Sequence, residues 1–271
     1  MAEKTGWERE YREHFDAIVD TYDKIRPSYP SAIFTDIAEY CGANAGKTAL
    51  EIGAGTGKAT ADMLDAGYDV MAVELGADMS AFLRERFGER DDFRVITSAF
   101  EDAQLPTNAF DLVYAASAFH WIDAEVGCPK VLRILRDGGT LAMFRYNAPP
   151  ADGDALYEEM QEAYKRFFHQ PYKRPQRITE TEYSSPAGIH KGFRCEPLEN
   201  YGFRDVTMKF YYNSRTFTTD EYIMMLDTFS DHIVLPDDDR AALYAGVRSA
   251  IERHGGRITV DYAFQLYMAR K

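Results

Sequence analysis

The chain has 271 residues, 45% of them hydrophobic and 28% charged, and a formal net charge of −13 at pH 7. A chain of this size can bury one substantial core, so a single domain spanning residues 1–271 is expected. A nucleic-acid binder neutralises phosphates with clustered Lys and Arg, so the acidic balance argues against a nucleic-acid partner. The absence of a run of about 18 apolar residues, and a polar start, predict a cytoplasmic protein that does not associate with membranes.

The cysteines indicate neither a disulfide framework nor a metal site. Cys41, Cys128 and Cys195 lie far apart in the sequence and show no paired metal-ligand spacing. Cysteines without a disulfide pattern are typical of proteins in a reducing compartment. We expect no bound metal.

The N-terminal segment predicts a helix, because apolar residues recur at spacings of three and four. These residues are Trp7, Tyr11, Phe15, Ile18 and Tyr22. The helix should end near Arg26, where the RPSYP sequence favours extended or turn conformations. A second helix is predicted over residues 31–40, ending at Gly42.

Residues 48–60, TALEIGAGTGKAT, are the strongest local signal in the chain. An apolar run containing Glu51 is followed by Gly53, Gly55 and Gly57 and then by helix-forming residues. This order predicts a strand, a tight loop and a helix. Glycine has no Cβ, so such a loop can bring backbone N–H groups against a ligand. The candidate cofactor-binding residues here are Glu51, Gly53, Ala54, Gly55 and Gly57.

Spacing separates the nucleotide-binding alternatives. A phosphate-binding P-loop needs a glycine where Ile52 stands and a Ser or Thr where Ala59 stands, so that alternative is set aside. A dinucleotide fingerprint needs its third glycine where Lys58 stands. An NAD(P) site is therefore less favoured, and it stays open.

A carboxylate follows the next predicted strand. Residues 68–73 read as a strand that ends in Glu74, followed by Leu75. A Rossmann-like fold places an acid about 20 residues after the glycines, where it accepts hydrogen bonds from ribose hydroxyls. Glu74 therefore favours a nucleoside ligand without identifying it.

The central segments show a distinctive order. A helix is predicted over 79–87 and strands over 93–97, 110–115 and 140–146, with a helix over 130–136 that Gly138 and Gly139 end. Between the strands lie the segments FED at 100–102 and AASAFHWID at 115–123. With the Glu-x-Gly-x-Gly-x-Gly loop and YDKIRPSYP at 22–30, this order resembles the class I S-adenosylmethionine (SAM) dependent methyltransferases, in particular those of the trans-aconitate methyltransferase type.

The resemblance implies a set of cofactor-binding residues. Tyr22 and Arg26 would contact the methionine carboxylate of SAM, and the backbone N–H of Phe100 would reach the adenine. Glu101 or Asp102 would accept from the adenine amine. Segment 115–123 would line the methionine end and the substrate entrance, with Ala116 and Trp121 near the cofactor. His120 is either a general base or a packing histidine.

The resemblance also implies the architecture. It predicts an α/β fold with a Rossmann-like, seven-stranded, mostly parallel sheet, helices on both faces, an antiparallel last strand and a helical or loop cap. Residues 1–35 would form a lid segment and 36–146 the SAM-binding core. Residues 147–200 and 218–256 would form the substrate cap, and 201–217 and 257–271 the final strands. Alternating patterns at 206–217 and 258–268, with two helices between them, agree with this plan.

These observations predict a SAM-dependent methyltransferase that acts on a small-molecule acceptor by in-line displacement, as a monomer or homodimer. Aromatic residues of the cap segments are expected to line the acceptor pocket. The basic stretch 165–177 is either a solvated helix end or an anion-binding patch. An NAD(P)-dependent oxidoreductase and a non-catalytic SAM-binding protein are the alternatives.

Overall fold

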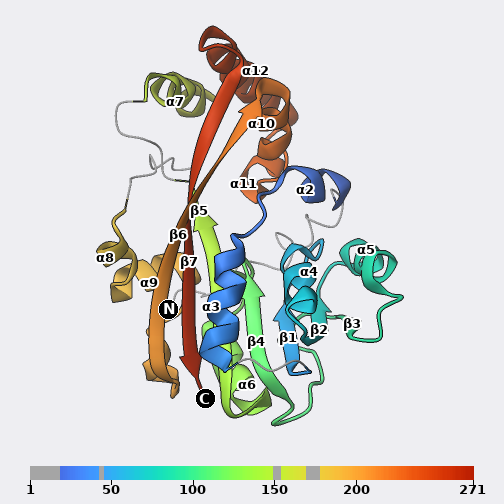
Figure 1. Cartoon of the computed structure of the whole chain (residues 1–271). Coiled ribbons are helices and arrows are strands. Elements are labelled where there is room, and N and C mark those ends of the chain that lie inside the picture. The colour runs from blue at the N-terminus through green and yellow to red at the C-terminus, as the bar shows by residue number, and fades with distance from the viewer. Residues whose placement is uncertain (1–18, 43–45, 149–153, 169–177) are drawn as a thin grey trace.

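A computed structural model describes residues 19–42, 46–148, 154–168 and 178–271 (Figure 1). The predicted helix positions Trp7, Tyr11, Phe15 and Ile18 lie outside the described residues. Most of the basic stretch, residues 169–177, does so too. Within the described ranges, no helix is both long and apolar enough to cross a membrane.

A seven-stranded sheet in the order β3-β2-β1-β4-β5-β7-β6 forms the centre of the molecule. Strands β1 to β5 run parallel, and β7 lies antiparallel between β5 and β6. The predicted fold class, including the antiparallel last strand, is confirmed. The strands are β1 Thr48–Ile52, β2 Asp69–Glu74, β3 Phe93–Thr97, β4 Phe110–Ala116, β5 Leu135–Asn147, β6 Arg204–Thr218 and β7 Arg257–Arg270.

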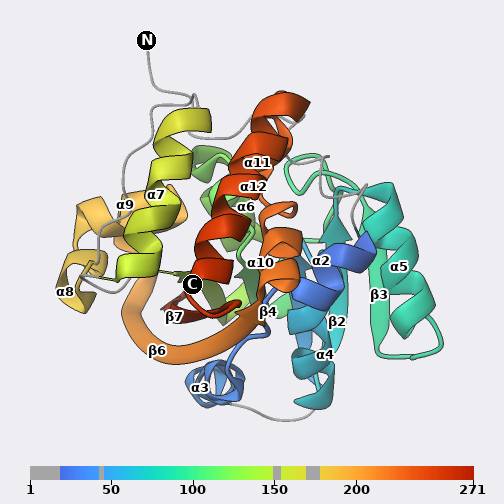
Figure 2. The ribbon, with the colours of Figure 1, turned by 90° about the horizontal axis from the view of Figure 1, so that it is seen from above.

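Helices cover both faces of the sheet and one of its ends (Figures 1 and 2). Those packed on the sheet are α3 Ser31–Cys41, α4 Lys58–Asp65, α5 Ala77–Phe87, α6 Ala124–Ile134, α8 Glu180–Tyr183 and α9 Pro186–Phe193. Those near the upper end in Figure 1 are α2 Val19–Ile25, α7 Ala155–Phe167, α10 Thr219–Leu226, α11 Ser230–Ile233 and α12 Asp237–Arg253. Short 3-10 turns occur at η2 Phe119–Trp121 and η3 Leu198–Tyr201.

Alternation along the strands divides the core into two layers. In β5, Leu141 and Met143 join the cluster packed under α6 and α9, whereas Ala142 and Phe144 join the cluster under α3 and α4. Successive side chains of a strand point to opposite faces, so both faces of this sheet are apolar and covered. Figure 2 shows α3 and α4 on one side of the sheet and α6 and α9 on the other.

The cap has a small apolar core of its own. Leu156, Met160 and Ala163 of α7 pack with Leu243 and Val247 of α12. Helix α2 packs against α10. Helix α2, from the N-terminal part of the chain, and helix α10, from the C-terminal part, therefore meet beyond the upper ends of the strands in Figure 1.

Two predictions of local structure were wrong. The helix expected over 130–136 spans Ala124–Ile134, because Asp123 caps it by accepting a hydrogen bond from the Glu125 amide. Residues 178–197, for which no helix was predicted, contain α8 and α9. Both short helices begin at a hydroxyl cap: Thr179 forms a capping box with Glu182, and Ser185 accepts from the Gly188 amide.

Gly57 holds the glycine loop against α5. Its φ is +80°, a value that side chains rarely adopt. A Cβ built on it would lie 2.5 Å from the Phe87 ring and 2.8 Å from a Leu83 methyl. The glycine therefore allows the loop to pack closely on the helix.

Replacing Gly57 with alanine should lower the free energy of unfolding by about 2 to 4 kcal/mol, through left-handed backbone strain and overpacking. Gly138→Ala is the matched control. It shares the positive φ, but a Cβ there would meet nothing within 4 Å. Urea unfolding should show a loss of roughly 1 to 2 kcal/mol for that variant. Equal losses for both variants would contradict the packing role of Gly57.

Candidate functional site

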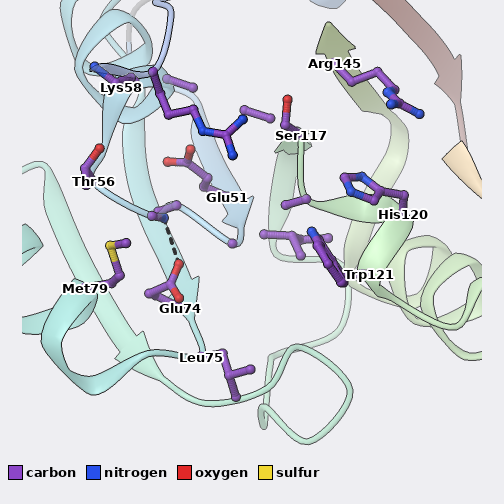
Figure 3. Close-up of a pocket in the computed structure, with 18 of the residues that line it drawn as sticks. Glu51, Thr56, Lys58, Glu74, Leu75, Met79, Ser117, His120, Trp121 and Arg145 are labelled. Carbon is purple, nitrogen blue, oxygen red and sulfur yellow. Dashed lines mark hydrogen bonds between the residues drawn. The ribbon is translucent and has the colours of Figure 1, made fainter. Parts of the chain in front are cut away.

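A cavity of about 460 Å³ lies at the carboxyl ends of β1, β2, β4 and β5 (Figure 3). Its volume falls in the range of about 300 to 1,000 Å³ that is usual for small-molecule sites. Ligands of open α/β sheets bind at this edge. The lining residues are Tyr22, 26–27, Tyr29, 51–56, 58–59, 73–75, Met79, 98–100, 116–118, 120–122, 145–146 and 229–231.

The fold brings most of the predicted site residues together at this cavity. Gly57 and Glu101 do not line it: Gly57 packs on α5, as described above, and Glu101 lies next to the lining residue Phe100. Whether each residue binds a ligand stays a prediction. The predicted residues that line the cavity are Tyr22, Arg26, Glu51, Gly53, Ala54, Gly55, Glu74, Leu75, Phe100, Ala116, His120 and Trp121.

Glu74 joins two loops at one end of the cavity. Its carboxylate accepts from the Gly55 amide at 2.7 Å and from the Gly76 amide at 2.9 Å (Figure 3). Only 8% of the residue is exposed. Backbone hydrogen bonds to both oxygens fix the carboxylate at the end of β2, beside the glycine loop.

Glu51 is a fully buried carboxyl at the end of β1. Its Oε2 accepts from Thr60 Oγ1 at 2.5 Å and from the Tyr114 hydroxyl at 2.9 Å. Its Oε1 is buried without a hydrogen-bond partner in the described structure. Burial raises the pKa of the Glu51 carboxyl to about 7, although both hydroxyls oppose the shift. The site therefore offers a strongly desolvated acid that a cationic ligand group would stabilise in its charged form.

The raised pKa of Glu51 predicts a pH dependence of stability. A protonated carboxyl contributes stability that is complete below its unfolded-state pKa and is lost as pH rises through about 7. Relative to Glu51→Gln, which cannot titrate, the wild-type unfolding free energy should fall by roughly 2 to 3 kcal/mol between about pH 5 and pH 8. Urea unfolding across this window measures the difference. Parallel profiles for the two proteins would contradict the assignment.

Arg26 connects α2 to the strand end and to the cap. Its guanidinium donates to the Tyr146 hydroxyl at 3.0 Å and to the Thr228 carbonyl at 2.6 Å. It also lies 4.6 Å from the Phe229 ring centroid and 5.2 Å from that of Tyr22. Cation–π contacts of this kind stabilise a buried guanidinium. Arg26 thereby ties α2 to the end of β5 and to the cap.

The turn after β4 packs against the glycine loop. Ser117 has a φ of +54° and donates its amide to the Phe144 carbonyl at 2.7 Å, while the Tyr29 hydroxyl donates to its Oγ at 2.9 Å. A Cβ on Gly53 would lie 2.7 Å from the Ala118 Cβ. The missing side chain at Gly53 lets these two loops meet, so both border one cavity.

His120 follows this turn and lies beside Trp121, with 5.2 Å between ring centroids. Burial lowers the pKa of its imidazole to about 3, and the positive charges of Arg145 and Arg194 add to the shift. An imidazole with this pKa is neutral at physiological pH and is a weak proton acceptor. The packing role of His120 fits the structure better than the role of a general base.

The neutral state of His120 is open to a direct test. Its imidazole resonances should not shift between about pH 5 and pH 8 in the folded protein, because burial disfavours the charged ring. Histidine-selective NMR with His120→Asn for assignment makes the measurement. The urea-unfolded protein is the control, in which the resonance should titrate near pH 6.5. A midpoint near 6.5 in the folded protein would restore His120 as a candidate base.

Sequence reasoning missed several lining residues, including Lys58, Arg145 and Tyr146. A signal was available for Arg145, which is the single charged residue of the predicted strand 140–146. Ser230 and Asp231 had no comparable signal, because the folding of α10 and α11 over the sheet brings them to the cavity.

The cap contributes less to the cavity than expected. Of the aromatic residues expected to line it, Phe229 does so, whereas Tyr164 and Phe168 pack around His232 within the cap. Tyr183 packs near Phe210 of β6. No described residue of 148–200 lines the cavity. Among described residues, no group of three or more His, Cys, Asp or Glu could hold a metal ion.

Comparisons with known proteins agree with this geometry. A family described as "Methyltransferase domain" matches residues 50–143. An uncharacterised methyltransferase of Mycobacterium tuberculosis is 33% identical over 48% of this chain and 50% of its own length. A Saccharomyces cerevisiae protein named "Probable S-adenosylmethionine-dependent methyltransferase" is 30% identical over 47% of this chain and 45% of its own. Over about half of its length, the chain is therefore similar to SAM-dependent methyltransferases.

The chain spans about half the length of these curated relatives. A solved structure of Haemonchus contortus phosphoethanolamine N-methyltransferase 2, in complex with SAM, is 16% identical. It has a TM-score of 0.54 over 96% of this chain and 60% of that chain, a likeness that concerns the fold alone. The cofactor of this methyltransferase family is SAM.

The residues around the cavity fit a SAM molecule. Glu74 and the glycine loop suit a nucleoside, and the unpartnered buried oxygen of Glu51 suits a cationic group. Arg26 suits a carboxylate, because a guanidinium presents several donors to such a group. The cavity therefore has complementary groups for each end of the cofactor.

Proposed function

We propose that this methyltransferase transfers a methyl group from SAM to a small-molecule acceptor. The observation that supports the proposal most is the grouping of the glycine loop, Glu74 and the turn at 116–122 around one cavity. A nucleoside bound to Glu74 would extend toward Ser117 and Trp121, on the other side of the cavity in Figure 3. The acceptor would bind on that side.

The proposed cofactor contacts follow the positions of the side chains. Glu74 would accept from the ribose hydroxyls, and residues 98–100 would border the adenine. Glu51 would face the amino group, and Arg26 and Tyr22 the carboxylate of the methionine part. Trp121 would lie near the sulfonium, where an aromatic face attracts a cation by about 0.5 to 2 kcal/mol.

The chain's contribution to catalysis is positioning. When bound, SAM supplies a methyl group that is already activated by a sulfonium leaving group. The acceptor atom must then lie in line with the methyl–sulfur bond, and alignment of this kind can lower a barrier by roughly 7 to 11 kcal/mol. Tyr29, Ser117 and Tyr146 hold the cavity wall in place through their hydrogen bonds. No general base is assigned.

Titration calorimetry tests the cofactor. SAM and S-adenosylhomocysteine should bind, and NAD and NADP should not, because the glycine spacing departs from the dinucleotide fingerprint. In the same assay, Glu74→Ala should weaken SAM binding by about 1 to 3 kcal/mol, through the loss of hydrogen bonds to a charged group. Glu85→Ala, an exposed acid of α5 away from the cavity, is the control.

Three results would overturn parts of the proposal. Tight binding of NAD or NADP, without binding of the sulfur nucleosides, would make the protein an oxidoreductase. Incubation with labelled SAM and a metabolite extract tests catalysis. If SAM binds and no labelled product forms, the protein is a non-catalytic SAM-binding protein. Unchanged SAM affinity in Glu74→Ala would place the ribose elsewhere.

A further inference from the structure

Arg145 is a buried cation at the acceptor side of the cavity. It lies near the end of β5 and lines the cavity close to His120 (Figure 3). Successive side chains of β5 point to opposite faces of the sheet. Tyr146 faces Arg26 and α2. Arg145 points to the opposite face, where its guanidinium donates to the Gly192 carbonyl of α9. A second bond, of 3.1 Å, goes to Asn147 Oδ1. The side chain is therefore held in place by neutral groups.

The positive charge of Arg145 has no carboxylate partner among the described residues. Its Nε is buried without a hydrogen-bond partner. Burial lowers the pKa of its guanidinium, and the like charge of Arg194 adds to this shift, although Tyr183 and Tyr146 oppose it. Burying a cation without an anion is costly, and an anion that completes the pair removes that cost. The same two arginines act on His120, so this end of the cavity is electropositive.

Four other charged side chains that line the cavity are held by contacts of their own. Glu51 and Glu74 are held at the glycine loop by their own hydrogen bonds. The Lys58 ammonium donates to the Asp23 carbonyl at 2.6 Å and lies 3.6 Å from the Asp23 carboxylate. Arg26 is tied to α2 and the cap. A fifth charged residue, Asp231, lines the cavity from α11, two residues after the Phe229 ring that contacts Arg26. Arg145 is the cation that remains for the acceptor.

We propose that the methyl acceptor carries an anionic group, a carboxylate or a phosphate, and that Arg145 binds it. This inference rests on the proposed function, because it assigns the cofactor to the opposite end of the cavity. A guanidinium offers a planar fork of donors that matches both groups. Neutral His120 and Trp121 would border the rest of the acceptor. Arg145 is then the residue that selects acidic acceptors over neutral ones.

The test titrates probe molecules into protein saturated with S-adenosylhomocysteine. The anionic probes are benzoate, citrate and phenyl phosphate, and benzamide is the neutral counterpart of benzoate. At least one anion should bind the wild type, with benzamide at least about 10-fold weaker. Arg145→Gln should weaken binding of that anion by about 10- to 100-fold, the range for losing hydrogen bonds to a charged group, and leave benzamide unchanged. Comparison of benzoate with phenyl phosphate separates the two anion classes.

Arg94→Gln is the matched control, since Arg94 is an exposed arginine of β3 away from the cavity, and it should bind the anions as the wild type does. Arg145→Lys keeps the positive charge but lacks the planar set of donors of a guanidinium. It should bind the anions more weakly than the wild type and more tightly than Arg145→Gln. Titration of S-adenosylhomocysteine into each variant reports an intact cofactor site. Its affinity should not change in the Arg145 variants.

Four outcomes would overturn the inference. These are benzamide binding as tightly as the anions, no binding of any of the three anions, full anion affinity in Arg145→Gln, and loss of S-adenosylhomocysteine affinity in the folded Arg145 variants. The last would assign Arg145 to the cofactor. Failure of wild-type protein to bind S-adenosylhomocysteine would instead overturn the proposed function itself.

Discussion

The hydrogen bonds between Glu74 and the two backbone amides of Gly55 and Gly76 are the constraint on which the site depends. They bring the loops after β1 and β2 to one carboxylate. A carboxylate that accepts from backbone N–H groups is favoured in its charged form and is hard to displace. The glycine loop is thereby fixed relative to the neighbouring strand before any ligand binds. The rest of the cavity is built outward from this corner.

Burial has opposite consequences for the other ionisable groups of the cavity. It raises the pKa of Glu51 and lowers that of His120, so each group favours its neutral form. Arginine keeps its charge when buried, because its pKa is far above the physiological range. Arg26 and Arg145 therefore carry fixed positive charge on the two faces of β5. The cavity differs in charge between its ends, and this difference suits a zwitterionic cofactor at one end and an acidic acceptor at the other.

Much of the fold could be predicted from the sequence. Short apolar runs placed β1 to β4 within about two residues, and alternating patterns placed β6 and β7. The errors occurred where short-range signals were weak. Helices α8 and α9 are too short to show an apolar period, and the start of α6 depends on the cap at Asp123. In each of these helices, the first residue depends on a hydrogen bond from a backbone amide to a single hydroxyl or carboxyl side chain.

By itself, the sequence indicated the resemblance to SAM-dependent methyltransferases, the mostly parallel seven-stranded sheet and many of the residues that line the cavity. These depend on backbone geometry, which a loop such as Gly53–Gly57 encodes locally through residues without Cβ. Only the tertiary structure decided that Gly57 packs on α5, that His120 is neutral and that Arg145 is a buried cation without an acid beside it. Charge and protonation depend on which groups surround a side chain, and those groups come from segments far apart in the chain.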